Sequence, residues 1–266
     1  MRRSQWLQAL RPGIGIPANY DLIWAMESIA TGRLFVATVI GSLAVLILGR
    51  VTQSSVTGYA YGALLFTVVS WPYVPRLIKT VRWTDMTIVQ SVLVLVASLT
   101  LGDAAQRILG FNPQASGMKQ MNWMTARHLL WQFPLVLPVE NLLLVGAMAW
   151  LWKFLRPNRS VTRIAVSVLS AALFGLWHVP FWGIWTMWTI GMSVLPWVIY
   201  MIMTGDIIAP LIAHILMDTI AVILSFGPHD SLIVRLFWPL LGTSLILLGL
   251  GYAVYQDWCS TRRKTI

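Results

Sequence analysis

The sequence is poor in cysteine and in charged side chains. One of its 266 residues is cysteine, Cys259, which excludes an intramolecular disulfide and a metal site built from several cysteines. Charged residues make up 11% of the chain and hydrophobic residues 58%. Disorder is excluded, because it needs low hydrophobicity and many charges. A water-soluble globule would lack polar surface to cover its core, so a membrane protein with several spans is the remaining class.

Acidic residues are especially scarce, since nine Asp and Glu oppose 19 Lys and Arg, for a formal net charge of +10. The basic residues lie in short clusters between long apolar runs, not in one dense stripe. This pattern is typical of membrane topology signals and disfavours nucleic acid as a partner. With the N-terminus inside, 14 basic residues fall on the inner side and 5 on the outer side. The bias predicts that both termini are cytoplasmic.

Eight apolar runs are long enough to be predicted as transmembrane helices. They lie near residues 34–49, 59–74, 86–102, 129–152, 164–182, 186–203, 207–226 and 232–255. We expect helices because lipid offers no hydrogen-bond partner to an open backbone, and the alternating pattern of a barrel is absent. The predicted fold class is therefore an all-α polytopic membrane helical bundle. Residues 34–256 would form the bundle, residues 1–33 an N-terminal cytoplasmic or interfacial segment, and residues 257–266 a cytoplasmic tail.

Four ionisable side chains lie inside these apolar runs, namely Glu140, His178, His214 and Asp218. A carboxylate at bilayer depth costs about 2.5–3.5 kcal/mol on insertion scales, so it indicates a functional site or a polar pair between helices. His214 and Asp218 are four residues apart, which places them one turn apart on one helix face. We expect all four to converge on one internal, water-accessible site. A carboxylate and two imidazoles there could activate water and stabilise an oxyanion.

The predicted span boundaries place these residues at different depths. If Pro138 starts the fourth span, Glu140 lies near its outer end, and His178 also lies near an outer end. His214 follows Asp206 closely and so lies near an inner end. A shared site then requires that residues 182–205 are tilted or re-entrant, or that the boundaries differ from those predicted.

Three motifs follow one another on these apolar segments. The first contains Glu140, the second is Phe174-x-x-x-His178, and the third is His214-x-x-x-Asp218. In order and spacing over residues 138–218 they resemble the CAAX-protease and bacteriocin-processing family, also called the Abi or type II CAAX endopeptidase family. The resemblance implies an intramembrane endopeptidase of about eight helices, with a core at about residues 123–226.

The resemblance also implies roles for the four residues. Glu140, paired with His178, would be the general base that activates water for attack on a peptide carbonyl. His214 and Asp218 would hold the developing oxyanion, or Asp218 would orient His214. The family is also described as metal-dependent, and Glu140, His178, His214 and Asp218 could ligate a divalent ion such as zinc. The sequence leaves a metal-dependent and a metal-free mechanism open.

The implied partners are the lipid bilayer and a peptide or membrane-protein substrate. A compact protein with several spans resembles the bacterial branch of the family. That branch implies a bacterial plasma membrane and the processing of membrane or bacteriocin-type peptides, with self-immunity as one role.

The first motif departs from the family pattern Glu-Glu-x-x-x-Arg. Asn141 replaces the second Glu, and Val145 replaces the Arg. If the Arg normally neutralises that Glu, both charges are lost together and none is left unpaired. We therefore favour an active peptidase, with a catalytically impaired immunity or binding protein as the alternative.

Two further classes of protein are compatible with some of these residues. A proton or small-solute transporter could also use buried Glu and His, and its helices could break at prolines, although no duplicated half is visible. A serine-type protease could pair Ser193 with His214 but would leave Glu140 unexplained. The zinc motif His-Glu-x-x-His is absent, because the sequence contains no His-Glu dipeptide.

Overall fold

A computed structural model describes residues 29–71, 73–80, 86–114, 123–155 and 160–225 of the chain. All of the regular elements in these ranges are helices. They are α4 (Thr31–Val51), α5 (Ser55–Val69), α6 (Tyr73–Thr80), α7 (Thr87–Leu109), α9 (Trp123–Leu155), α10 (Ser160–Trp177), α11 (Val179–Trp182), α12 (Thr186–Thr204) and α13 (Ile208–Ser225). The predicted eighth span near residues 232–255 and the tail at 257–266 lie outside the described residues, as does most of the segment 1–33.

Four of the described helices, α4, α7, α9 and α12, are long and apolar enough to cross a membrane. Three shorter apolar helices, α5, α10 and α13, coincide with three further predicted spans. Large apolar side chains such as Leu43, Ile47 and Leu64 are about half exposed on the outside of the bundle, as lipid-facing residues are. The prediction of a polytopic all-α membrane bundle is confirmed.

The structure places two boundaries near the ionisable residues differently from the prediction. Helix α9 begins at Trp123 and continues through Pro134 and Pro138, so Glu140 lies in its middle and not at an end. Proline is tolerated in a membrane helix because neighbouring groups can satisfy the backbone that it frees. Helix α10 ends at Trp177, earlier than the predicted 182, because Pro180 lies at the start of the separate short helix α11.

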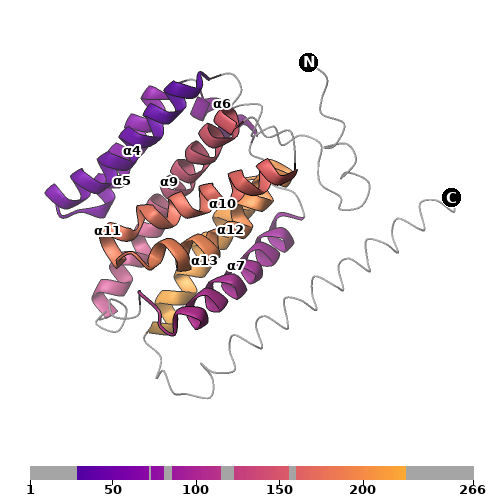
Figure 1. Cartoon of the computed structure of the whole chain (residues 1–266). Helices are drawn as coiled ribbons and strands as arrows, with labels where there is room; N and C mark the ends of the chain where they lie inside the picture. The colour runs from indigo at the N-terminus through magenta and orange to yellow at the C-terminus, as the bar shows by residue number, and fades with distance from the viewer. Residues whose placement is uncertain (1–28, 72, 81–85, 115–122, 156–159, 226–266) are drawn as a thin grey trace, which may run out of the picture.

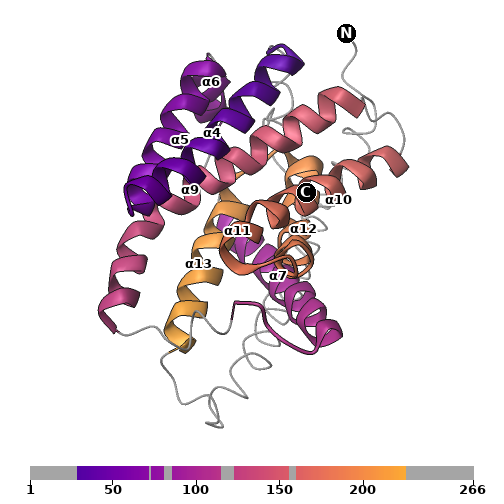
Figure 2. The same cartoon turned by 60° about the vertical axis from the view of Figure 1, so that its left-hand side comes forward.

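Helix α9 lies at the centre of the described bundle. It contacts α4 and α5 on one side and α10 and α13 on the other, as Figures 1 and 2 show. Helices α7 and α12 complete the second group, since α12 packs against α10 and α7, and α13 also packs against α7. Any polar side chain on the inner faces of α5, α9, α10 and α13 is thereby directed away from lipid.

Helices α4 and α5 approach closely because small residues line their contact. A Cβ added at Gly58 would lie 2.7 Å from the carbonyl oxygen of Val45 and 2.9 Å from the Cα of Gly49. Small residues allow such backbone approach between membrane helices. The close contact fixes the position of Tyr59, the next residue of α5, relative to α9.

Candidate active site

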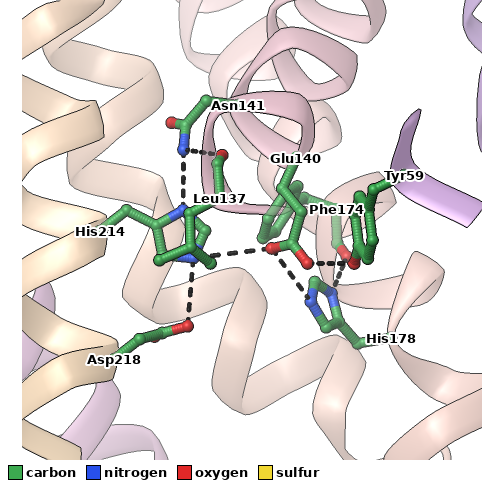
Figure 3. A network of polar contacts seen from close by, with 8 residues as sticks. All are labelled: Tyr59, Leu137, Glu140, Asn141, Phe174, His178, His214 and Asp218. Carbon is green, nitrogen blue, oxygen red and sulfur yellow. Dashed lines mark hydrogen bonds and ion pairs between the residues drawn. The ribbon is translucent and has the colours of Figure 1, made fainter. Parts of the chain in front are cut away.

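Glu140 connects the polar side chains that meet between α5, α9, α10 and α13 (Figure 3). Its side chain is only 8% exposed. One carboxylate oxygen, Oε1, accepts a hydrogen bond from the hydroxyl of Tyr59. The other, Oε2, lies 3.6 Å from Nε2 of His214 and 3.9 Å from Nε2 of His178. The structure thus brings Glu140 and both histidines together, although they come from three separate helical segments.

Asp218 joins this group from the same helix as His214. Its Oδ2 lies 3.6 Å from Nε2 of His214, as the four-residue spacing predicts. Asp218 is 33% exposed, whereas the side chains of Glu140, His178 and His214 are 14% exposed or less. Asp218 therefore marks the side on which the polar group is most open to its surroundings.

His178 follows the last residue of α10 and is oriented by its own chain. Its Nδ1 lies 2.8 Å from the carbonyl oxygen of Phe174. A carbonyl oxygen can only accept, so Nδ1 carries a proton, and in the neutral ring Nε2 keeps its lone pair toward Glu140. The Phe174 ring packs 4.8 Å from the imidazole of His178 and 6.2 Å from that of His214, measured between centroids. The Phe-x-x-x-His motif thus supplies both the orienting carbonyl and the apolar surface on which both imidazoles rest.

Two polar partners in the site were not predicted from the sequence. Tyr59 comes from α5, and its ring also packs edge-to-face on Trp177 with centroids 6.0 Å apart. Nothing in the local sequence distinguishes it from Tyr61, which is exposed. Asn141, interpreted from the sequence only as a departure from the family motif, has its Nδ2 2.8 Å from Nδ1 of His214. The one sequence signal for Asn141 was its position as a polar residue beside Glu140 in an apolar run.

Val145, the second departure from the family motif, is fully buried among apolar side chains of the core. It takes no part in the polar group. With valine in place of the family's arginine, this position of α9 is therefore packed by apolar side chains.

Asp206 lies in the linker between α12 and α13 and is buried there. Its Oδ1 accepts from the backbone N–H of Ile208 at 2.8 Å, and its Oδ2 accepts from the Tyr200 hydroxyl at 3.2 Å. Burial raises the pKa of the Asp206 carboxyl. Because Asp206 accepts from an N–H in the first turn of α13, it fixes the start of the helix that carries His214 and Asp218.

Glu140, His178, His214 and Asp218 are residue types that can bind a divalent metal. Among the described residues, no group of three or more His, Cys, Asp or Glu side chains is arranged to hold a metal ion. The described residues therefore present no preformed metal site, and no step of the reaction is assigned to a metal.

Ser193, the residue of the serine-protease alternative, is directed elsewhere. Its hydroxyl donates to the carbonyl of Thr189 at 3.0 Å, and its side chain lies against Gly102 of α7. The hydroxyl therefore faces α7 and not His214 on α13, which disfavours a Ser–His pair.

The comparisons with known proteins address the same part of the chain. Residues 122–220 match a family model described as type II CAAX prenyl endopeptidase Rce1-like. The matched segment contains Glu140, Asn141, His178 and His214 and ends two residues after Asp218. A search of curated proteins and of solved structures found no significant match.

Proposed function

We propose that the chain hydrolyses peptide bonds within the membrane, because its residues 122–220 match the type II CAAX prenyl endopeptidase Rce1-like family model. The reacting water would be activated by Glu140 and His178. The observation that carries the proposal is the meeting of Glu140, His178 and His214 inside an apolar bundle. Oε2 of Glu140 and Nε2 of His178 are 3.9 Å apart, too far for a direct hydrogen bond but close enough for both to hold one water.

In the proposed reaction the water oxygen attacks the peptide carbonyl carbon while Glu140 takes a proton from the water. The carbonyl electron pair moves to its oxygen, and the resulting oxyanion accepts a hydrogen bond from His214. The tetrahedral intermediate then collapses, the C–N bond breaks, and the proton held by Glu140 passes to the leaving amine. Asp218 either donates to the oxyanion in its protonated form or orients His214.

Two assays on reconstituted vesicles test this function against the transporter alternative. One follows cleavage of a quenched fluorescent peptide library, and the other follows an internal pH-sensitive dye. We expect cleavage by the wild-type chain, no cleavage by Glu140→Gln, and no proton flux in either. Proton flux that depends on Glu140, without cleavage, would replace the peptidase by a transporter.

Natural substrates can be sought among all the proteins of a membrane at once. Membranes carrying the wild-type chain are compared by terminal proteomics with membranes carrying Glu140→Ala. New protein termini in apolar or membrane-proximal segments, present only with the wild type, are the expected result. Identical sets of termini would favour the alternative of a catalytically impaired binding or immunity protein.

Replacement of Tyr59 by phenylalanine is expected to lower kcat by about 10-fold or more. The hydroxyl holds Oε1 of Glu140, and a hydrogen bond to a charged group contributes about 1.5–3 kcal/mol. The aromatic contact with Trp177 is kept, so the fold should be unchanged. The matched control is Tyr61→Phe, an exposed tyrosine on the same helix. Equal kcat values for the two variants would show that the Tyr59 hydroxyl does not support Glu140.

Asp218→Asn is expected to retain activity to within about 10-fold. An amide N–H₂ can donate to an oxyanion without an added proton, and Asn at this position occurs in the family pattern that the sequence resembles. Asp218→Ala, which removes the polar group, should lose about 10²-fold in kcat. The measurement is the initial cleavage rate in vesicles. A complete loss in Asp218→Asn would indicate that the negative charge of Asp218 is required.

A further inference from the structure

The side-chain amide of Asn141 has one chemically acceptable orientation. Its Nδ2 lies 2.9 Å from the carbonyl oxygen of Leu137 and 2.8 Å from Nδ1 of His214. The opposite orientation would place the amide oxygen against the Leu137 carbonyl oxygen, where two acceptors repel. The amide nitrogen therefore faces both partners, and its two protons are enough for two hydrogen bonds.

The orientation of Asn141 determines which ring nitrogen of His214 carries the proton. An amide N–H₂ can only donate, so Nδ1 of His214 must accept and must be unprotonated. We propose that Asn141 is a positioning residue that holds His214 in its Nε2–H tautomer. The Nε2–H group then points toward Glu140 and Asp218, each with an oxygen 3.6 Å away.

The two histidines consequently present opposite atoms to the site. His178 donates through Nδ1 to the Phe174 carbonyl and offers the lone pair of Nε2, whereas His214 offers an Nε2–H donor. One imidazole is thereby suited to accept a proton or hold water, and the other to stabilise an oxyanion. The tautomers follow from the hydrogen bonds alone. Only the catalytic roles given to the two imidazoles rest on the proposed peptidase function.

The proposal also explains the departure of Asn141 from the family motif. A carboxylate at position 141 would put an acceptor oxygen where Nδ2 of Asn141 faces Nδ1 of His214. Nδ1 would then carry the proton, and Nε2 of His214 would lose it. The asparagine therefore changes the character of His214 from acceptor to donor. A ring whose Nε2 carries a proton has no lone pair there for a metal.

The tautomers can be read directly by ¹⁵N NMR of the full chain, labelled at histidine, in lipid bilayers. At about pH 8, where an ordinary histidine is neutral, protonated and unprotonated ring nitrogens give separate signals. We expect His214 as Nε2–H and His178 as Nδ1–H in the same sample. Signals are assigned by His214→Gln and His178→Gln, with His128→Gln at an exposed residue of α9 as the control. A protonated Nδ1 in His214 of the wild type would overturn the proposal.

Asn141→Asp is the decisive variant, because it keeps the size of the side chain and adds an acceptor oxygen. We expect His214 to change to the Nδ1–H tautomer and kcat to fall by about 10²-fold with little change in KM, since one oxyanion donor is lost. Ser98→Ala, which removes a buried hydroxyl bonded within α7, is the control and should change neither measurement. An unchanged His214 signal in folded Asn141→Asp would also overturn the proposal.

The outcomes separate this inference from the proposed function. Nε2–H in His214 of a wild type that cleaves no peptide supports the role of Asn141 and refutes the peptidase. Nδ1–H in an active wild type refutes the role of Asn141 and leaves the peptidase standing. If Asn141→Asp does not fold, the protonated ring nitrogen of His214 in the wild-type spectrum alone decides whether Asn141 has this role.

Discussion

Replacement of Glu140 by glutamine should reduce peptide hydrolysis by about 10³–10⁴-fold while the helical bundle remains folded. Glutamine keeps an oxygen that can accept from Tyr59, so the buried polar group retains its shape. The amide cannot take a proton from water, and general-base catalysis contributes up to about 10⁴-fold. The rate is measured in vesicles, and folding by circular dichroism and thermal unfolding.

The matched control for this variant is Asp103→Asn, which makes the same carboxylate-to-amide change at an exposed position. Asp103 pairs with Arg107 at 2.6 Å at the end of α7, and an exposed pair of this kind contributes little to stability. We expect its activity to equal that of the wild type. Turnover by Glu140→Gln at the wild-type rate would remove Glu140 from the reaction and with it the proposed mechanism.

His178→Ala is expected to lower kcat by about 10³-fold. The substitution removes the Nε2 lone pair that faces Glu140, so the water would be held from one side only. The cleavage rate should be compared with that of His128→Ala, which removes an exposed imidazole from α9 and should have no effect. A His178→Ala rate within a few-fold of the control would indicate that Glu140 activates the water without His178.

The double variant Glu140→Gln with His178→Ala tests independently whether these two residues act on the same step. Residues that act on one step are strongly non-additive, so the double variant should be about as slow as the slower single variant. If the two effects multiply, Glu140 and His178 act in separate steps.

The fold was largely predictable, because each span is a local property of the sequence. Apolar runs become helices wherever they meet lipid, so the predicted runs near residues 34–49, 86–102 and 186–203 correspond to α4, α7 and α12. The predicted helix boundaries were wrong where tertiary packing overrides a local sequence rule. Pro138 suggested a helix start, but α9 continues through it, and Glu140 moved from a helix end to the middle.

Only the ionisable residues of the candidate site could be predicted from the sequence. Glu140, His178, His214 and Asp218 stand out because ionisable groups are rare in apolar runs. The structure brings these side chains together, while their catalytic roles stay predictions. The cytoplasmic termini, the bacterial membrane and the domain limits at residues 33 and 256 also stay predictions.

The sequence by itself determined the membrane class, the helical state and the shared face of His214 and Asp218, because hydrophobicity and helical periodicity act between near neighbours. Only the tertiary structure decided that Tyr59 donates to Glu140 and that Asn141 donates to His214. Those contacts join residues 81 and 73 positions apart, and their formation depends on which helix faces meet. Helix packing, not local sequence, therefore fixed the hydrogen-bond partners of the site.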